Sequence, residues 1–207
     1  MLPLLQVQDL SLSFEGQLLF EKVDFSLAAG ELLLLHGPSG SGKSSLLQAI
    51  MGMGNTRNLK GRIVLHGSDI TPLSVEKHSQ AGIAFIPEKR PIFPELSVGE
   101  HLKLSAKGKI DDSLLPDFPV LQSRQKQLAG TLSGGEQAVL SCVMVQQQNP
   151  SVILWDMPLK GLSSDWVRKI FRIIRLFKNK GIPMLMAVQN PADWQAFEPK
   201  LWQLGNP

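Results

Sequence analysis

A glycine-rich octapeptide near the start of the chain has the residue types that bind phosphate groups. It reads Gly37-Pro38-Ser39-Gly40-Ser41-Gly42-Lys43-Ser44 and fits the pattern G-x-x-x-x-G-K-[S/T]. Glycines let the backbone wrap its N–H groups around phosphates, the ammonium of Lys43 can reach the terminal phosphates, and the hydroxyl of Ser44 can ligate Mg²⁺. The sequence therefore predicts a phosphate-binding loop, which we extend to Ser45, rather than a chance match in an irregular loop.

An aspartate at the end of an apolar stretch could supply the second half of such a site. Residues 152–155 read Val-Ile-Leu-Trp and are followed by Asp156. An aspartate that ends a strand is often only a capping residue. Beside a phosphate-binding loop, however, a carboxylate in this place can hold the coordination shell of Mg²⁺. We therefore predict that Asp156 is the metal partner of Ser44.

A second anion site is predicted at the start of another helix. Residues 132–137 read Leu-Ser-Gly-Gly-Glu-Gln, in which Ser133 and Glu136 have the spacing of a capping box. Gly134 and Gly135 leave backbone N–H groups uncovered at the helix N-terminus, where the helix dipole favours negative charge. This helix end therefore has the features that attract a phosphate.

The spacing of apolar residues indicates the elements that must position these motifs. Alternation predicts a β-hairpin, and short apolar runs predict further strands, at 5–14, 18–27, 32–35, 61–65, 82–86, 152–155 and 184–188. Helical spacing predicts helices over 43–53 and 164–180, and Ser97 with Glu100 predicts a helix that starts near Val98. We interpret the basic residues of 164–180 as a solvated face. The pattern indicates a mostly parallel sheet wrapped by helices, with a helical insertion between 88 and 132.

Composition excludes several classes of protein. The 207 residues carry 21 Lys and Arg against 18 Asp and Glu, a net charge of +3 that is too small to argue for a nucleic-acid partner. A single cysteine, Cys142, excludes an internal disulfide framework and a multi-cysteine zinc site. No apolar run approaches the roughly 20 residues that a membrane helix needs. We therefore expect a cytoplasmic protein without direct membrane insertion.

The three motifs in this order resemble the nucleotide-binding subunit of ATP-binding cassette (ABC) transporters. The resemblance is greatest to the ATPases of branched-chain amino-acid and urea importers, judged from the segments IPEKRPIFPELSVGEHL and QLAGTLSGGEQ. It implies ATP and Mg²⁺ as ligands and a P-loop NTPase (RecA-like) α/β fold, with a mostly parallel core, an antiparallel β subdomain and an inserted helical subdomain. The expected boundaries are 1–88 and 133–207 for the core with its β subdomain, and 89–132 for the helical subdomain.

The resemblance also implies roles for single residues. Phe14 would stack on adenine, with a core phenylalanine as the less favoured alternative. Glu88 stands at the family's glutamine position and would lie near the metal with Ser44 and Asp156. Two subunits would dimerise head to tail, so that the signature of one covers the phosphates bound by the other. That assigns a trans contact to Ser133, Gly134, Gly135 and Glu136.

Two departures from the family affect the chemistry. The catalytic glutamate that follows the magnesium aspartate is replaced by Met157, and the histidine that contacts the γ-phosphate is replaced by Gln189. A thioether cannot accept a proton from water, so the loss of this base should cost on the order of 10²–10⁴ in rate. We predict that Mg²⁺ and ATP bind while hydrolysis at this site is very slow. Glu88 as a substitute base is a minor alternative.

The sequence leaves more than one function open. The leading hypothesis is a degenerate subunit that pairs with a non-identical, complete ATPase and with transmembrane permease subunits, at the inner face of the cytoplasmic membrane. A weakly active homodimer is a second hypothesis, and a nucleotide-gated regulatory protein without a transport role is a third. A stand-alone kinase or GTPase fits least, because Asn179-Lys180-Gly181 lacks the acid of a guanine-reading loop.

Overall fold

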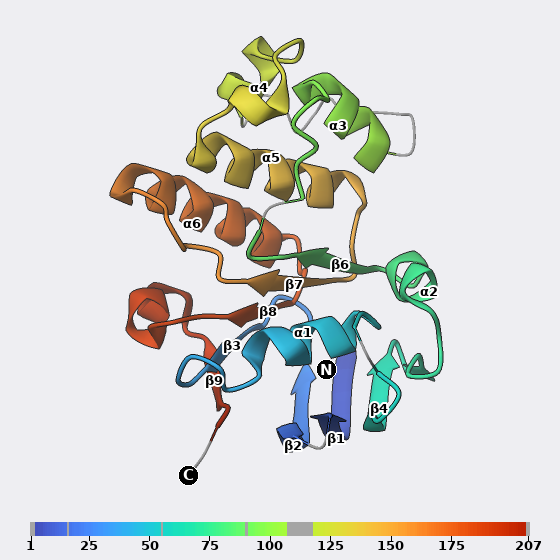
Figure 1. The fold of residues 1–207 in the computed structure, drawn as a ribbon. Helices are drawn as coiled ribbons and strands as arrows, with labels where there is room; N and C mark the ends of the chain where they lie inside the picture. The colour runs from blue at the N-terminus through green and yellow to red at the C-terminus, as the bar shows by residue number, and fades with distance from the viewer. Residues whose placement is uncertain (1–2, 16, 55, 90, 107–117, 206–207) are drawn as a thin grey trace.

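Two β-sheets form the frame of the molecule. The computed structural model describes residues 3–15, 17–54, 56–89, 91–106 and 118–205. A four-stranded antiparallel sheet has the order β2-β1-β4-β5, and a five-stranded parallel sheet has the order β6-β7-β8-β3-β9 (Figure 1). The strands are β1 (Leu5–Phe14), β2 (Gln17–Leu27), β3 (Leu32–His36), β4 (Lys60–Leu65), β5 (Ser68–Asp69), β6 (Ile83–Ile86), β7 (Val152–Asp156), β8 (Met184–Ala187) and β9 (Lys200–Gln203).

Helices cover both faces of the parallel sheet. They are α1 (Lys43–Ile50), α2 (Val75–Gln80), α3 (Val98–Ser105), α4 (Pro119–Ser123), α5 (Gly134–Gln147) and α6 (Ser164–Asn179), with 3₁₀ turns at Ala129–Thr131 and Pro191–Phe197. Figure 1 shows α5 and α6 on one side of the sheet and α1 with the antiparallel sheet on the other. Together with the parallel order of its strands, this confirms the expected fold class: a parallel α/β core with an antiparallel β unit.

The side chains of each parallel strand alternate between two apolar cores. In β3, Leu32 and Leu34 belong to the core under α5 and α6, whereas Leu33 and Leu35 belong to the core around α1. All four leucines are at most 3% exposed. A strand that is buried on both faces needs apolar residues at every position, which is why this segment reads as a continuous run rather than as an alternation.

Of the predicted helical segment 89–132, residues 90 and 107–117 lie outside the described residues, and the remainder contains α3, α4 and the 3₁₀ turn Ala129–Thr131. Helix α3 begins at Val98 behind a complete capping box, in which Ser97 N–H donates to Glu100 Oε2 at 2.7 Å and Glu100 N–H donates to Ser97 Oγ at 3.3 Å. Figure 1 shows α3 and α4 beyond α5, on the side away from the sheet. No helix among the described residues is long and apolar enough to cross a membrane.

The structure differs from the expected elements in several places. Helix α1 ends at Ile50 rather than near residue 53, because Gly52 adopts φ +74°, a left-handed conformation that stops a helix. The strand β9 and the short helix α2 were not expected from the sequence. β9 has only four residues and becomes a strand by pairing with β3, a partner far away in the chain.

Candidate nucleotide-binding site

The glycine-rich loop connects β3 to α1 and is held in a form that requires glycine. Gly37, Gly40 and Gly42 have φ values of +144°, +82° and +89°. A Cβ atom on Gly37 would lie 2.2 Å from the carbonyl oxygen of Leu204, and one on Gly42 would lie 2.5 Å from that of Leu19. The loop is therefore wedged between β2 and the residues that follow β9, and its glycines are required by space as well as by conformation.

The ammonium group of Lys43 lies inside this loop. Its Nζ donates hydrogen bonds to the carbonyl oxygens of Gly37 at 2.9 Å and Pro38 at 2.7 Å, and to Ser41 Oγ at 3.2 Å. Lys43 is only 5% exposed, and this burial lowers its pKa while the nearby charge of Asp156 opposes the shift. No side chain in the described part of the chain caps the N-terminus of α1, so its first N–H groups remain open to a phosphate.

Asp156 ends β7 beside the loop in a buried position. It is 4% exposed, and its Oδ1 has no hydrogen-bond partner among the described residues. Burial raises the pKa of Asp156 and the charge of Glu88 raises it further, while a hydrogen bond from Ser44 and the charges of Lys43 and Lys160 lower it. A buried carboxylate oxygen without a partner, next to a hydroxyl and a second carboxylate, matches the oxygen ligands that Mg²⁺ uses together with substrate phosphates. The residues present therefore fit the predicted metal.

A cavity of about 420 Å³ opens over the loop, within the range of small-ligand sites. Most residues predicted for the site line it, and the lining consists of Leu19, Gly37, Ser39, Gly40, Ser41, Gly42, Lys43, Ser44, Ser45, Glu88, Met157, Lys160 and Gln189. Pro38 contributes its carbonyl oxygen to Lys43, and Asp156 lies behind Ser44. Phe14, at the end of β1, is 41% exposed and is not among the residues that line this cavity, so its contact with adenine stays a prediction.

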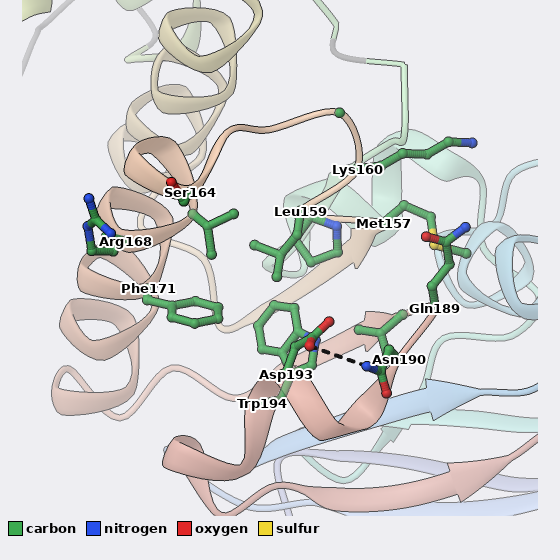
Figure 2. A pocket seen from close by; sticks show the side chains of 14 residues that line it. Met157, Leu159, Lys160, Ser164, Arg168, Phe171, Gln189, Asn190, Asp193 and Trp194 are labelled. Atoms are coloured by element: carbon green, nitrogen blue, oxygen red, sulfur yellow. Dashed lines mark hydrogen bonds between the residues drawn. The ribbon is translucent and has the colours of Figure 1, made fainter.

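The two departures from the family pattern meet at this cavity. Met157 and Gln189 line it and also line an adjoining cavity of about 610 Å³. Figure 2 shows their side chains next to each other, on the side of the adjoining cavity opposite Arg168 and Phe171. The N–H of Met157 donates to the carbonyl oxygen of Ala187 at 3.0 Å, which joins the ends of β7 and β8. Neither side chain can exchange a proton with water at neutral pH, so this end of the site can bind but lacks a base at either position.

Lys160 is a residue of this site that the sequence analysis did not identify. It lies in the loop after β7, lines both cavities, and forms an ion pair with Glu88 in which Nζ and Oε1 are 2.5 Å apart. The only signal in the sequence is a lysine three residues after Met157. The two partners are 72 residues apart in the chain, and only the pairing of β6 with β7 brings them together.

The signature residues form a separate surface at the N-terminus of α5. Ser133 N–H donates to Glu136 Oε2 at 2.8 Å, Glu136 N–H donates to Ser133 Oγ at 3.3 Å, and Arg124 pairs with Glu136 at 2.9 Å. Ser133 and Gly134 are exposed, while Gly135 is buried against the ring of Trp166. None of these residues lines the cavity over the loop, so the described residues place the two anion-binding motifs apart.

Comparisons with known proteins agree with this geometry. A family profile described as "ABC transporter" matches residues 20–160. The chain is 34% identical to a probable branched-chain amino acid transport ATP-binding protein LivF of Archaeoglobus fulgidus, covering 85% of this chain and 77% of the relative. It is 33% identical to the high-affinity branched-chain amino acid transport ATP-binding protein BraG of Pseudomonas aeruginosa, over 81% of this chain and 74% of the relative. These matches confirm the resemblance drawn from the motifs.

More distant similarities extend the comparison to other transport systems and to solved structures. The lipopolysaccharide export system ATP-binding protein LptB of Escherichia coli is 28% identical, over 90% of this chain and 80% of the relative. A crystal structure of the ADP conformation of an ATP-binding cassette from an ABC transporter superposes with a TM-score of 0.86 at 22% identity, covering 99% of this chain and 88% of that one. At this identity the superposition shows the fold alone.

Proposed function

The chain belongs to the ABC transporter family of ATP-binding subunits, and from that membership we propose that its own site binds Mg²⁺ and ATP but hydrolyses ATP very slowly. The observation that carries the proposal is the set of residues in and behind the cavity over the loop. The loop with Lys43 and Ser44 lines this cavity and Asp156 lies behind it, while two neutral side chains, Met157 and Gln189, stand where the resemblance expects a base and a γ-phosphate contact. The proposed site thus binds ATP but lacks the groups that would hydrolyse it quickly.

Each part of the proposed site has a defined task. The amides of the loop and the ammonium of Lys43 bind the phosphates, and Ser44, Asp156 and Glu88 hold the metal. Mg²⁺ supplies positive charge that neutralises the phosphates. The missing base costs roughly 3–5 kcal/mol of barrier, equivalent to about 10²–10⁴ in rate. Glu88 is a poor substitute base because, in the proposed site, its carboxylate serves the metal.

The intact signature favours pairing with a complete ATPase. Its capping box is formed, Ser133 and Gly134 are exposed, and these residues lie away from the chain's own cavity. We therefore propose that α5 serves the phosphates of a second, non-identical ATPase subunit, while the chain's own site holds ATP as a clamp. A weakly active homodimer is the alternative. Purification of the chain alone as an ATP-dependent dimer would favour that alternative.

Attachment to a permease, on the cytoplasmic side of the membrane, is proposed for the described parts of residues 89–132, namely 91–106 and 118–132. Large apolar side chains are exposed in this region, with Phe93 57%, Leu104 62% and Leu128 49% exposed. Exposed apolar side chains are common at protein–protein contacts. A non-transport regulatory role would leave this region without a membrane partner, so co-purification with a multi-span membrane protein would separate the two functions.

Restoring the two family residues tests the proposal directly. We expect Met157→Glu with Gln189→His to raise the ATPase rate of the purified chain by about 10²-fold or more, because the site regains its base. Nucleotide affinity should change little, since the loop and Asp156 are untouched. The measurement is phosphate release together with equilibrium binding of ATP.

The matched control is Met157→Gln with Gln189→His. Glutamine has the shape of glutamate but cannot accept a proton, so this control should bind ATP and remain as slow as the wild type. Equal rates for the Glu variant and the wild type would count against the proposal, as would a wild type that already turns over like a complete ATPase.

A further inference from the structure

One cation at the phosphate site is unexplained by the roles assigned so far. Lys160 reaches the cavity over the loop from the segment after β7, and its ammonium contacts the carboxylate of Glu88. Figure 2 shows the Lys160 side chain on the same side of the adjoining cavity as Met157 and Gln189, the two positions at which family residues are replaced. Lys160 therefore lies at the same end of the site as the two neutral replacements, Met157 and Gln189.

The charges that surround the cavity give Lys160 a distinct position. The charged side chains in the described lining are Lys43, Glu88 and Lys160, with Asp156 behind them. Lys43 is 5% exposed and is held by loop carbonyls, whereas the side chain of Lys160 is 54% exposed. Lys160 is thus the cation on the open side of the cavity, and its long, half-exposed side chain can change partners at low cost.

Resting on the proposed function, we propose that Lys160 is a specificity-determining residue that recognises the terminal phosphate of ATP. Its ammonium pairs with Glu88 in the nucleotide-free chain and moves to the γ-phosphate when ATP is bound. A terminal phosphate carries more negative charge than a carboxylate, so it competes well for this cation. The exchange frees Glu88 to face the metal, and ADP, which has no γ-phosphate, leaves the pair with Glu88 in place.

The proposal predicts a selective loss of ATP affinity. Lys160→Gln should weaken ATP binding by roughly five- to tenfold, the size expected for one charge-assisted hydrogen bond that is partly exposed to solvent. ADP binding should change by less than about twofold. Lys160→Arg should retain the preference for ATP, because it keeps the charge. Lys77→Gln is the matched control, since it removes the same charge from the exposed surface of α2.

A purely structural role for Lys160 makes a different prediction in a second background. If Lys160 only neutralises Glu88, then Lys160→Gln should have no effect on the ratio of ATP to ADP affinity once Glu88→Gln is already present. If Lys160 contacts the γ-phosphate, the same substitution should still lower that ratio in the Glu88→Gln background. Comparison within one background cancels any contribution of Glu88 to metal binding.

Equilibrium titration with ATP and with ADP, in the presence of Mg²⁺, distinguishes the outcomes. A lower ratio in both backgrounds supports the proposal. An unchanged ratio in the Glu88→Gln background, or equal losses for ATP and ADP, would overturn it. A wild-type chain that binds neither nucleotide would instead refute the proposed function on which the inference rests.

Discussion

At the scale of single residues, the site buries charged groups that favour ligand binding at the expense of the stability of the ligand-free protein. Asp156 is buried with an oxygen that has no partner among the residues described, and Lys43 is buried with its charge held by carbonyls of a glycine-rich loop. Burying a charged group without full compensation costs free energy. Phosphate and metal would provide the missing partners, so a binding-competent site is expected to be a source of instability in the nucleotide-free chain.

Replacing the buried carboxylate should therefore stabilise the empty protein. Asp156→Asn removes the charge and keeps the shape, and we expect it to raise the free energy of unfolding by about 1 kcal/mol, because a neutral amide costs less to bury than a carboxylate. For a chain of this length, that corresponds to an increase in Tm of about 2–4 °C. The same variant should lose most of the thermal stabilisation that Mg²⁺ and ATP give the wild type. Thermal unfolding with and without both ligands measures the two effects.

The gain in stability of Asp156→Asn over the wild type should depend on pH in a defined direction. The pKa of Asp156 is raised above its ordinary value of 3.8, so folding favours its protonated form. The penalty in the wild type is therefore complete at pH values above the raised pKa and declines as the pH falls through the raised pKa towards 3.8. The difference in Tm between Asp156→Asn and the wild type should shrink over this range. A difference that grows on acidification would contradict the assignment.

At the scale of secondary structure, the contact between α5 and α6 fixes the signature. A Cβ atom on Gly135 would lie 2.2 Å from the indole ring of Trp166, so glycine is the residue that lets α6 approach the first turn of α5. On the opposite flank, Arg124 after α4 pairs with Glu136, which is 7% exposed and also completes the capping box. The signature glycine therefore has a packing role besides its predicted role in binding phosphate.

Gly135→Ala should destabilise the fold by about 1–3 kcal/mol, because the added methyl group overlaps the indole ring of Trp166. Trp166→Leu should cost stability by itself through lost packing. In combination, the two changes should be less destabilising than the sum of the single effects, since the smaller side chain leaves room for the methyl group. Denaturant unfolding of the wild type, the two single variants and the double variant measures the coupling free energy between residues 135 and 166. Strict additivity would show that the contact is not the cause.

The sequence predicted those elements whose signal is local. The loop of residues 37–44 and the capping boxes at Ser97 and Ser133 lie within a few consecutive residues, and the buried strands are short apolar runs. Features that depend on the order of strands were missed. β9 exists because β3 offers it an edge, and Lys160 meets Glu88 only because β6 and β7 are neighbours. No local pattern records such distant contacts.

At the scale of the whole molecule, the loop and the signature lie on separate surfaces of the chain. One surface carries the loop, with Lys43 and Ser44 lining its cavity, and the other carries the exposed signature at Ser133. Since none of the signature residues lines the chain's own cavity, each surface can be altered without touching the other. This separation allows the proposed pairing to be tested by its effect on the partner's site.

Ser133→Arg should abolish ATP hydrolysis by the complex of this chain with a complete partner ATPase, because a bulky side chain at the N-terminus of α5 would block the partner's phosphates. The chain's own affinity for ATP should remain within about twofold of the wild type, since Ser133 does not line its cavity. Ser79→Arg, on the exposed surface of α2, is the matched control. Unaltered hydrolysis in the Ser133→Arg complex would exclude the signature role.

The position of β3 has a consequence for biosynthesis. This strand carries the phosphate-binding loop, but its neighbours in the sheet, β8 and β9, are made from residues 184–187 and 200–203. A ribosome that adds roughly 5–20 residues per second therefore completes the strand's partners on the order of 10 s after the loop itself has been synthesised. Until then, the nascent chain lacks both neighbours of this apolar strand, so the loop cannot yet be held in its folded form.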